Sequence, residues 1–153
     1  MSKVESNQTN SNHIVYYDST LDNEYLLLSN YSNTIILIDN IIYPTIEHYY
    51  LSMKMSDVNI RSQIMNAKNA ENATTISNQN EHLWNAYWDL NKLTIMERAL
   101  RVKFNSNCDA RELLLSTLNK PIINYSDDPF WGGLNNGLNN LGKLLEKIRN
   151  EIK

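Results

Sequence analysis

The stretch that most constrains the fold is YPTIEHYYLSMKM, residues 43–55, because a helix has to begin inside it. Pro44 favours an extended entry, and Thr45 can accept a hydrogen bond from an amide of the first turn. Four residues then follow at the i, i+3, i+4, i+7 spacing of one helix face: Ile46, Tyr49, Tyr50 and Met53. We predict a helix here that buries this face in the core.

A carboxylate and an amine lie on another face of the same helix. Glu47 and Lys54 are seven positions apart, nearly eclipsed and about 10.5 Å apart along the axis at a rise of about 1.5 Å per residue. That spacing suits a ribose that carries a phosphate or a second ring. The alternative is that Glu47 only complements the helix dipole and that Lys54 lies on a solvated face.

The segments before this helix predict a small antiparallel sheet. Short β-branched or aromatic runs occupy 13–18, 24–31 and 34–44, and Asp39-Asn40 can form a tight hairpin because both residues tolerate positive φ. Residues 1–12 are polar and predict a disordered tail. We expect 13–153 to form a single domain.

The segments after this helix are mostly helical, so the predicted fold class is α+β, mainly helical. They are, in order, a helix capped by Ser56-Asp57, a helix end and loop over 69–80, a long helix over 81–104 with a break at Trp88-Asp89, a helix over 108–118 capped by Asn107, and a strand over 121–125. On the long helix, one apolar face is expected to consist of Leu93, Met96, Leu100 and Phe104.

All four glycines lie near the C-terminal end, at Gly132, Gly133, Gly137 and Gly142. Glycines concentrated in a loop indicate positive φ or a very close approach to something else, for which a ligand is the natural candidate. The helix expected to begin near Leu138 would favour an anion at its N-terminus. An ordinary tight turn is the alternative, since no GxGxxG or GxxxxGK[ST] pattern is present.

Charge and cysteine content restrict the partners and the compartment. A net charge of −3 gives no diffuse attraction to nucleic acid or to an anionic membrane, so we expect no stable nucleic-acid partner. The single cysteine, Cys108, cannot form an internal disulfide, and no apolar run approaches the roughly 18 to 20 residues of a membrane span. We expect a soluble cytoplasmic protein.

Four motifs together resemble the YbiA-like or NADAR family of N-glycosidases. They are YPTIEHYY at 43–50, W-x3-K-x3-M-x2-AL-x2-KF at 88–104, D-x2-WG at 128–132 and G-x-N-x-LG at 137–142. The resemblance runs from about Tyr16, through LSNY at 28–31, to Arg149. The chain departs from the family pattern in two places. Leu51 stands where members usually carry Gln, and HLWNAYW replaces the basic segment usually found before the motif tryptophan.

The resemblance implies a YbiA-like fold and cleavage of an N-glycosidic bond between ribose and a base-like ring. We expect no cofactor, and no metal is implied, because His13, His82 and Cys108 show no metal-ligand spacing. One substrate class is the phosphoribosylamino-pyrimidine intermediates of early riboflavin synthesis, released as ribose 5-phosphate and a pyrimidine; the other is ADP-ribose attached to a nucleobase such as guanine. The residues that match the family motifs are Glu47 and Asp128, expected to be catalytic, and Ser29, Asn30, Lys54, Trp88, Lys92, Trp131 and Asn139, expected to bind substrate.

The chemistry of the reaction agrees with these residue types. Breaking the bond builds positive charge on the sugar and negative charge on the leaving nitrogen, which calls for a carboxylate and a proton donor. Trp88 and Trp131 offer flat faces for a base. Each residue also has a structural alternative: Asp128 as a turn residue before Pro129, and the tryptophans as core. A catalytically inactive nucleotide-binding module is a further alternative, and the net charge favours a small substrate over a nucleic acid.

Overall fold

The computed structural model describes residues 14–16 and 24–153. The tail predicted over 1–12 lies outside the described residues. The elements are β1 Ile14–Tyr16, η1 Leu26–Leu28, β2 Ile36–Ile38, β3 Ile41–Tyr43, α1 Ile46–Lys54, α2 Val58–Met65, α3 Ala70–Gln79, η2 Glu81–Leu83, α4 Trp88–Ser106, α5 Cys108–Ser116, β4 Ile122–Asn124 and α6 Asn140–Glu151. The predicted fold class is therefore confirmed: helices dominate, and the antiparallel sheet is small.

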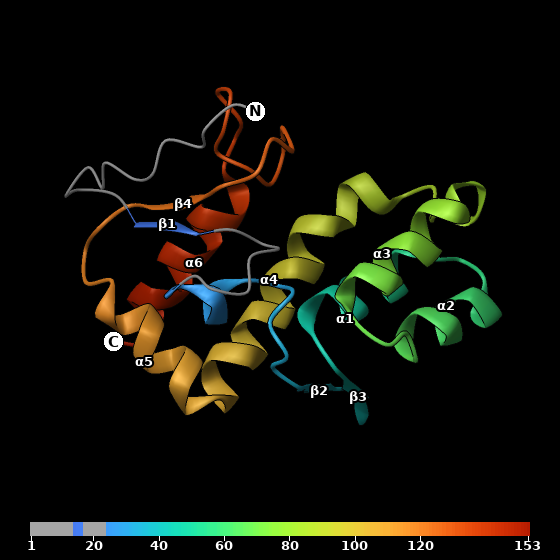
Figure 1. Cartoon of the computed structure of the whole chain (residues 1–153), viewed down its shortest axis with the longest axis horizontal. Coiled ribbons are helices and arrows are strands. Elements are labelled where there is room, and N and C mark those ends of the chain that lie inside the picture. Colours follow the sequence, from blue (N-terminus) through green and yellow to red (C-terminus); the bar gives the residue numbers. More distant parts are fainter. Residues whose placement is uncertain (1–13, 17–23) are drawn as a thin grey trace, which may run out of the picture.

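Helix α4 is the central element. It runs through the middle of the molecule, with α1, α2 and α3 on one side and α5, α6, β1 and β4 on the other (Figure 1). It begins at Trp88, where the sequence predicts a break, and Met96, Leu100 and Phe104 are buried as expected. Leu93 is 40% exposed, so the predicted apolar face of this helix is buried only from Met96 onward.

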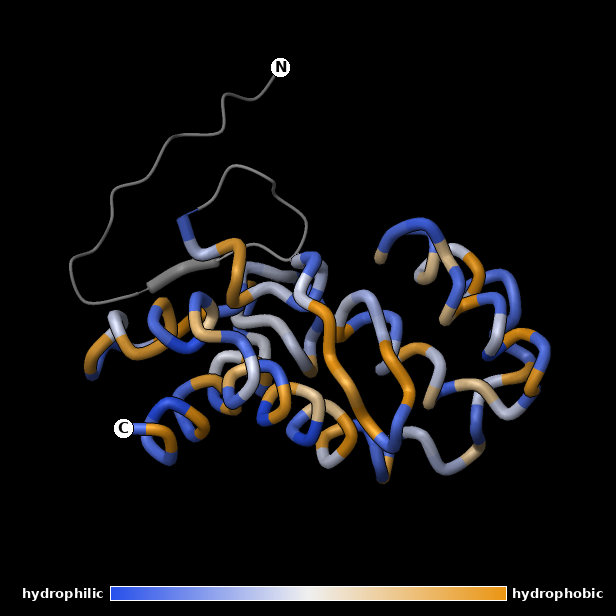
Figure 2. Tube along the Cα trace, turned by 90° about the horizontal axis from the view of Figure 1, so that it is seen from below, coloured by the Kyte–Doolittle hydropathy of each residue, from blue (hydrophilic) through white to orange (hydrophobic). Residues whose placement is uncertain are grey.

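The hairpin of β2 and β3 is the antiparallel sheet, and its turn is the predicted one. Asp39 and Asn40 have φ of 52° and 63°. Arg98 of α4 holds the turn through an ion pair of 2.7 Å to Asp39. The hairpin is a nearly continuous hydrophobic segment (Figure 2), yet Ile36 is buried and Leu37 is exposed, because successive strand residues face opposite sides.

The prediction of a strand over 24–31 is wrong. This run forms the 3₁₀ turn η1 and then a loop. Ser29 Oγ accepts a hydrogen bond from the Tyr31 amide at 3.1 Å, and Ser32 Oγ donates to the Ser29 carbonyl at 3.0 Å. Such local side-chain bonds compete with strand pairing, which explains why an apolar run does not become a strand here.

The strand predicted over 121–125 is confirmed as β4, but its pairing differs from the antiparallel sheet expected for the first run. β4 pairs in parallel with β1, with Ile14 opposite Ile122 and Tyr16 opposite Asn124. The two sheets are separate, and each has two strands. Parallel partners far apart in sequence leave no local signal of their pairing.

The prediction of a helix end and loop over 69–80 is also wrong, because residues 70–79 form the helix α3. The Asn69 side chain accepts a hydrogen bond from the Asn72 amide at 2.8 Å and caps the helix. Its buried face consists of Ala70, Ala73 and Ser77. These small side chains have helical spacing but little hydrophobicity, so the pattern is weak although the face is fully covered.

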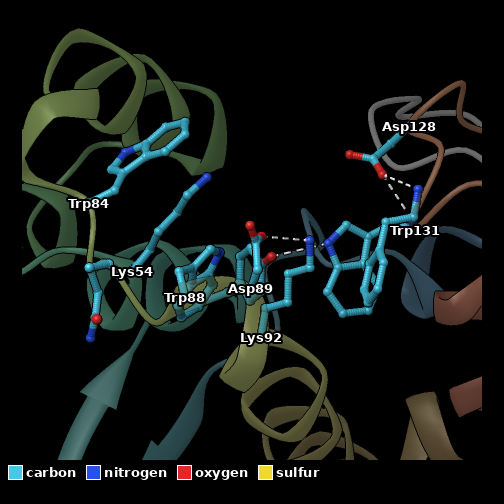
Figure 3. A pocket seen from close by; sticks show the side chains of 11 residues that line it. Lys54, Trp84, Trp88, Asp89, Lys92, Asp128 and Trp131 are labelled. Atoms are coloured by element: carbon cyan, nitrogen blue, oxygen red, sulfur yellow. Dashed lines mark hydrogen bonds and ion pairs between the residues drawn. The ribbon is translucent and has the colours of Figure 1, made fainter.

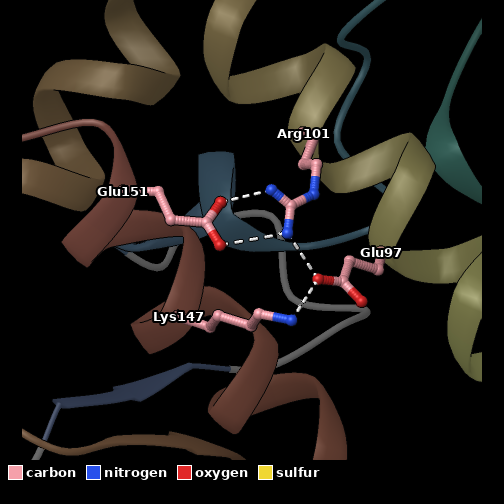
Figure 4. A network of polar contacts seen from close by, with 4 residues as sticks. All are labelled: Glu97, Arg101, Lys147 and Glu151. Atoms are coloured by element: carbon pink, nitrogen blue, oxygen red, sulfur yellow. Dashed lines mark hydrogen bonds and ion pairs between the residues drawn. The ribbon is translucent and has the colours of Figure 1, made fainter.

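A surface network joins α4 to α6. Arg101 pairs with Glu97 at 2.6 Å and with Glu151, and Lys147 pairs with Glu97 at 2.7 Å (Figure 4). Exposed pairs of this kind contribute about 1 kcal/mol or less each. Their effect here is to fix α6 against α4, which helps to hold the loop that precedes α6. No helix in the described part of the chain is both long and apolar enough to cross a membrane.

Candidate functional site

Two adjoining cavities lie where α1, the start of α4 and the loop before α6 meet. Their volumes are about 240 and 190 Å³. Tyr50, Asp128 and Trp131 line both cavities. Trp88 lines the larger one and Glu47 the smaller one, so the expected site residues are divided between two neighbouring cavities that share Tyr50, Asp128 and Trp131.

The larger cavity contains both expected lysines, each held against an aromatic ring (Figure 3). Lys54 Nζ lies 3.3 Å from the centroid of Trp84, and Lys92 Nζ lies 4.0 Å from the centroid of Phe130. Lys92 also pairs with the exposed Asp89 at 3.0 Å. A ring face orients an ammonium group without neutralising it, so the positive charge remains able to attract an anion.

The surroundings of Lys54 shift the pKa of its amine. Burial lowers the pKa of Lys54, and the negative charge of Glu47 opposes this shift. Glu47 and Lys54 therefore influence each other along α1, as their spacing suggests, although they line different cavities.

Trp84 is a site residue that the sequence reasoning missed. Its Nε1 donates to the Ser77 carbonyl of α3 at 3.1 Å, which fixes the ring, and the Asn85 amide donates to the Lys54 carbonyl at 2.7 Å. The segment HLWNAYW is thus held against the end of α1 and supplies an aromatic wall of the cavity. The signal was its place in HLWNAYW, four positions before Trp88, where the chain departs from the family pattern.

The smaller cavity is lined by Glu47 and by the loop of Asn30 and Tyr31. Glu47 is half-buried in the first turn of α1, and its amide donates to the Asn30 carbonyl at 3.3 Å. Asn30 is only 4% exposed. Its Nδ2 lies 3.5 Å from the Met96 sulfur, whereas its Oδ1 has no hydrogen-bond partner among the described residues.

Asp128 both caps a turn and lines the two cavities. Its Oδ1 accepts hydrogen bonds from the amides of Phe130 and Trp131, each at 2.8 Å. The other carboxylate oxygen points away from this turn (Figure 3). The turn role considered from the sequence is therefore real, and it fixes the orientation of the carboxylate at the junction.

Tyr50 lies at the centre of the aromatic cluster between the cavities. It is 7% exposed, as its core position predicts. Its hydroxyl accepts a hydrogen bond from Trp131 Nε1 at 3.1 Å, and its ring packs edge-on against Trp88 and Trp131 at centroid distances of 4.8 and 5.8 Å. Sequence periodicity assigned Tyr50 to the core alone and missed that it lines both cavities.

Ser29 and Asn139 line neither cavity, contrary to the contacts expected for them. Ser29 is fully buried, and its carbonyl accepts from the buried Lys103 at 2.8 Å. The side chain of Asn139 forms two hydrogen bonds with the backbone of β4. Its Oδ1 accepts from the Asn124 amide and its Nδ2 donates to the Ile122 carbonyl, both at 2.9 Å. Both residues shape the loops that bear Asn30 and Asp128.

The glycine loop packs against the chain itself, so the expectation of a ligand there is not supported. None of the described glycines has positive φ. A Cβ on Gly132 would overlap the Ser126 carbonyl oxygen, and one on Gly142 would overlap the Ile122 carbonyl oxygen. These glycines are required for backbone contact, which brings the loop of Asp128 and Trp131 close to β4 and α6.

Among residues 14–16 and 24–153, no group of three or more His, Cys, Asp or Glu side chains could hold a metal ion.

Comparison with known proteins relates the whole described chain to enzymes of one class. The NADAR domain family model matches residues 15–153. The chain is 37% identical over 135 residues to the N-glycosidase Npun_R5314 of Nostoc punctiforme, covering 84% of this chain and 86% of that protein. It is 30% identical over 142 residues to the N-glycosidase YbiA of Escherichia coli, covering 91% of this chain and 88% of that protein.

The fold agrees with the sequence comparison. The NMR structure of Escherichia coli YbiA superposes with a TM-score of 0.80 at 27% identity, covering 94% of this chain and 89% of that one. A further relative is the chloroplastic riboflavin biosynthesis protein PYRR of Zea mays, 35% identical over 127 residues. That match covers 74% of this chain but only 20% of the maize protein.

Proposed function

The chain belongs to the NADAR domain family, and on that premise we propose that this N-glycosidase hydrolyses phosphoribosylamino-pyrimidine intermediates of early riboflavin biosynthesis. The products are ribose 5-phosphate and the free pyrimidine. One observation carries the proposal: a cavity with two lysines adjoins a cavity with a glutamate, and Asp128 lines both.

The phosphate belongs in the larger cavity. Lys54 and Lys92 are its cations, and the rings of Trp84 and Phe130 hold them in place. The smaller cavity contains Glu47, and the described residues that line it include no lysine or arginine, so Glu47 would repel a phosphate there. A phosphorylated sugar therefore fits with its phosphate among the lysines and its anomeric carbon towards the carboxylates.

The two carboxylates, Glu47 and Asp128, can stabilise the charges that develop in the reaction. As the bond between the anomeric carbon and nitrogen breaks, its electron pair goes to the nitrogen, which takes up a proton, while a water oxygen bonds to the anomeric carbon and loses a proton. Glu47 and Asp128 stabilise the positive sugar and exchange these protons. Trp131, half-buried and lining both cavities, offers a face to the pyrimidine, whereas Trp88 is largely packed against Tyr50.

The small substrate is favoured over ADP-ribose on a nucleobase for two reasons. The cavities, at about 240 and 190 Å³, suit a phosphoribosyl pyrimidine, and a net charge of −3 does not favour a polyanionic nucleic acid. The name of the maize relative, a riboflavin biosynthesis protein, points to the same substrate class.

The test is to incubate the purified protein with a phosphoribosylamino-pyrimidine and, separately, with ADP-ribosylated guanine. We expect ribose 5-phosphate from the first and little ADP-ribose from the second. Release of ADP-ribose alone would overturn the proposed substrate but keep the N-glycosidase. No release from either by a folded protein would indicate the inactive nucleotide-binding module instead.

A further inference from the structure

The hydroxyl of Tyr50 has a hydrogen that no described residue accepts. An indole N–H can only donate, so the bond of 3.1 Å from Trp131 Nε1 uses the phenolic oxygen as acceptor. The hydroxyl's own hydrogen is left for another group. Because Tyr50 lines both cavities while 93% of it is buried, that group has to come from within the cavities.

The smaller cavity also contains an acceptor without a donor. Asn30 Oδ1 is buried and has no hydrogen-bond partner in the described part of the chain, although the residue lines this cavity. A buried polar atom without a partner costs about 1 to 3 kcal/mol, so such atoms in a cavity wall indicate a polar ligand. The cavity thus presents one free donor, from Tyr50, and one free acceptor, from Asn30.

A sugar hydroxyl is the group that satisfies both, because it accepts one hydrogen bond and donates another. A phosphate oxygen would only accept, and it would lie beside Glu47. We propose that Tyr50 and Asn30 together bind one hydroxyl group of the ribose, so that the enzyme selects ribosyl over deoxyribosyl substrates. This inference rests on the proposed function.

The electrostatics keep Tyr50 in the form that this role requires. Burial raises the pKa of Tyr50 above its usual range; the hydrogen bond from Trp131 opposes this shift, and the negative charges of Glu47 and Asp128 reinforce it. The phenol therefore stays protonated and remains a donor at neutral pH. Glu47 and Asp128 line the smaller cavity together with Tyr50, so a sugar hydroxyl bound by Tyr50 would lie in the same cavity as the carboxylates.

The test compares the ribosyl substrate with its 2′-deoxy and 3′-deoxy analogues in wild type and in Tyr50→Phe. We expect wild type to lose about 10²-fold or more in kcat/KM on one of the two analogues, because a site built for a hydroxyl rejects a substrate that lacks it. Tyr50→Phe should lose about 10-fold on the ribosyl substrate and almost nothing on that analogue, so the discrimination ratio falls.

Tyr49→Phe is the matched control. It deletes a buried phenolic hydroxyl one position away on α1, but Tyr49 packs against Tyr43 and lines neither cavity. Its discrimination ratio should equal that of wild type. If Tyr50→Phe does not fold, Asn30→Ala provides the same comparison.

Wild type alone can already overturn the inference. Equal cleavage of all three sugars would overturn the inference and leave the N-glycosidase intact, whereas no cleavage of the ribosyl substrate would count against the proposed function itself. Equal losses on all three sugars in Tyr50→Phe would assign the hydroxyl a structural role only.

Discussion

Glu47→Gln distinguishes the proposed catalytic role of this residue from a purely structural one. The substitution keeps the size and most of the hydrogen bonding of the side chain and removes its negative charge. Glu47 is half-buried, lies in the first turn of α1 and lines the smaller cavity. The charge can therefore act on the helix dipole, on a bound sugar, or on both.

The two roles differ in magnitude. A full positive charge about 4 Å from a carboxylate gains about 4 kcal/mol at an effective dielectric constant near 20. With roughly half or more of a charge on the sugar in the transition state, the loss is about 2 to 4 kcal/mol, or roughly 30- to 1000-fold in kcat. The helix-dipole interaction contributes only about 0.3 to 1 kcal/mol, and to stability rather than to rate.

Glu71→Gln is the matched control, since Glu71 is the second residue of α3 as Glu47 is the second of α1, and it is exposed away from the cavities. Single-turnover release of ribose 5-phosphate and urea denaturation are measured for both variants. We expect similar small changes in unfolding free energy and a rate loss in Glu47→Gln only. A Glu47→Gln enzyme with a wild-type single-turnover rate would refute the assignment.

Three further outcomes follow from the structure. Glu47→Gln should lower the pKa of Lys54 still further, because in wild type the Glu47 carboxylate favours the charged amine against the effect of burial. An NMR titration of the side-chain amine measures this pKa, and an unchanged or raised value in the variant would contradict the coupling. Gly132→Ala should cost about 3 kcal/mol or more in urea denaturation, since its Cβ would overlap the Ser126 carbonyl oxygen, and a neutral effect would show that the loop yields freely. Thr45→Ala should cost about 1 to 2 kcal/mol in the same assay, because its side chain accepts a hydrogen bond from an amide in the first turn of α1.

Local chemistry was enough to predict the elements whose boundaries depend on their own side chains. Thr45 caps α1 and Asn107 caps α5, in both cases by accepting an amide hydrogen bond near the predicted helix start. Asp39 and Asn40 form the predicted turn because both residues tolerate positive φ. These signals are encoded within a few residues, and nothing distant competes with them.

The failures have the opposite origin. Helix α3 depends on small residues covered by neighbouring helices, so its periodicity carries little hydrophobic contrast. The pairing of β1 with β4 joins residues more than 100 positions apart, and no local pattern encodes it. At the candidate site, motif positions pointed to Glu47 and Asp128, which line the cavities, whereas Trp84 occupies a segment where this chain departs from the family.

Tyr49 and Tyr50 show why periodicity cannot separate core from site. Both are buried on adjacent positions of α1, yet Tyr49 packs against Tyr43 of the hairpin and Tyr50 against Trp131. The difference arises from what covers each ring, and Tyr50 is covered by a loop more than 70 residues further along the chain. That loop is held to β4 by Asn139, which itself lines neither cavity. A residue matched as a substrate contact thus acts on the site by fixing the loop that completes it.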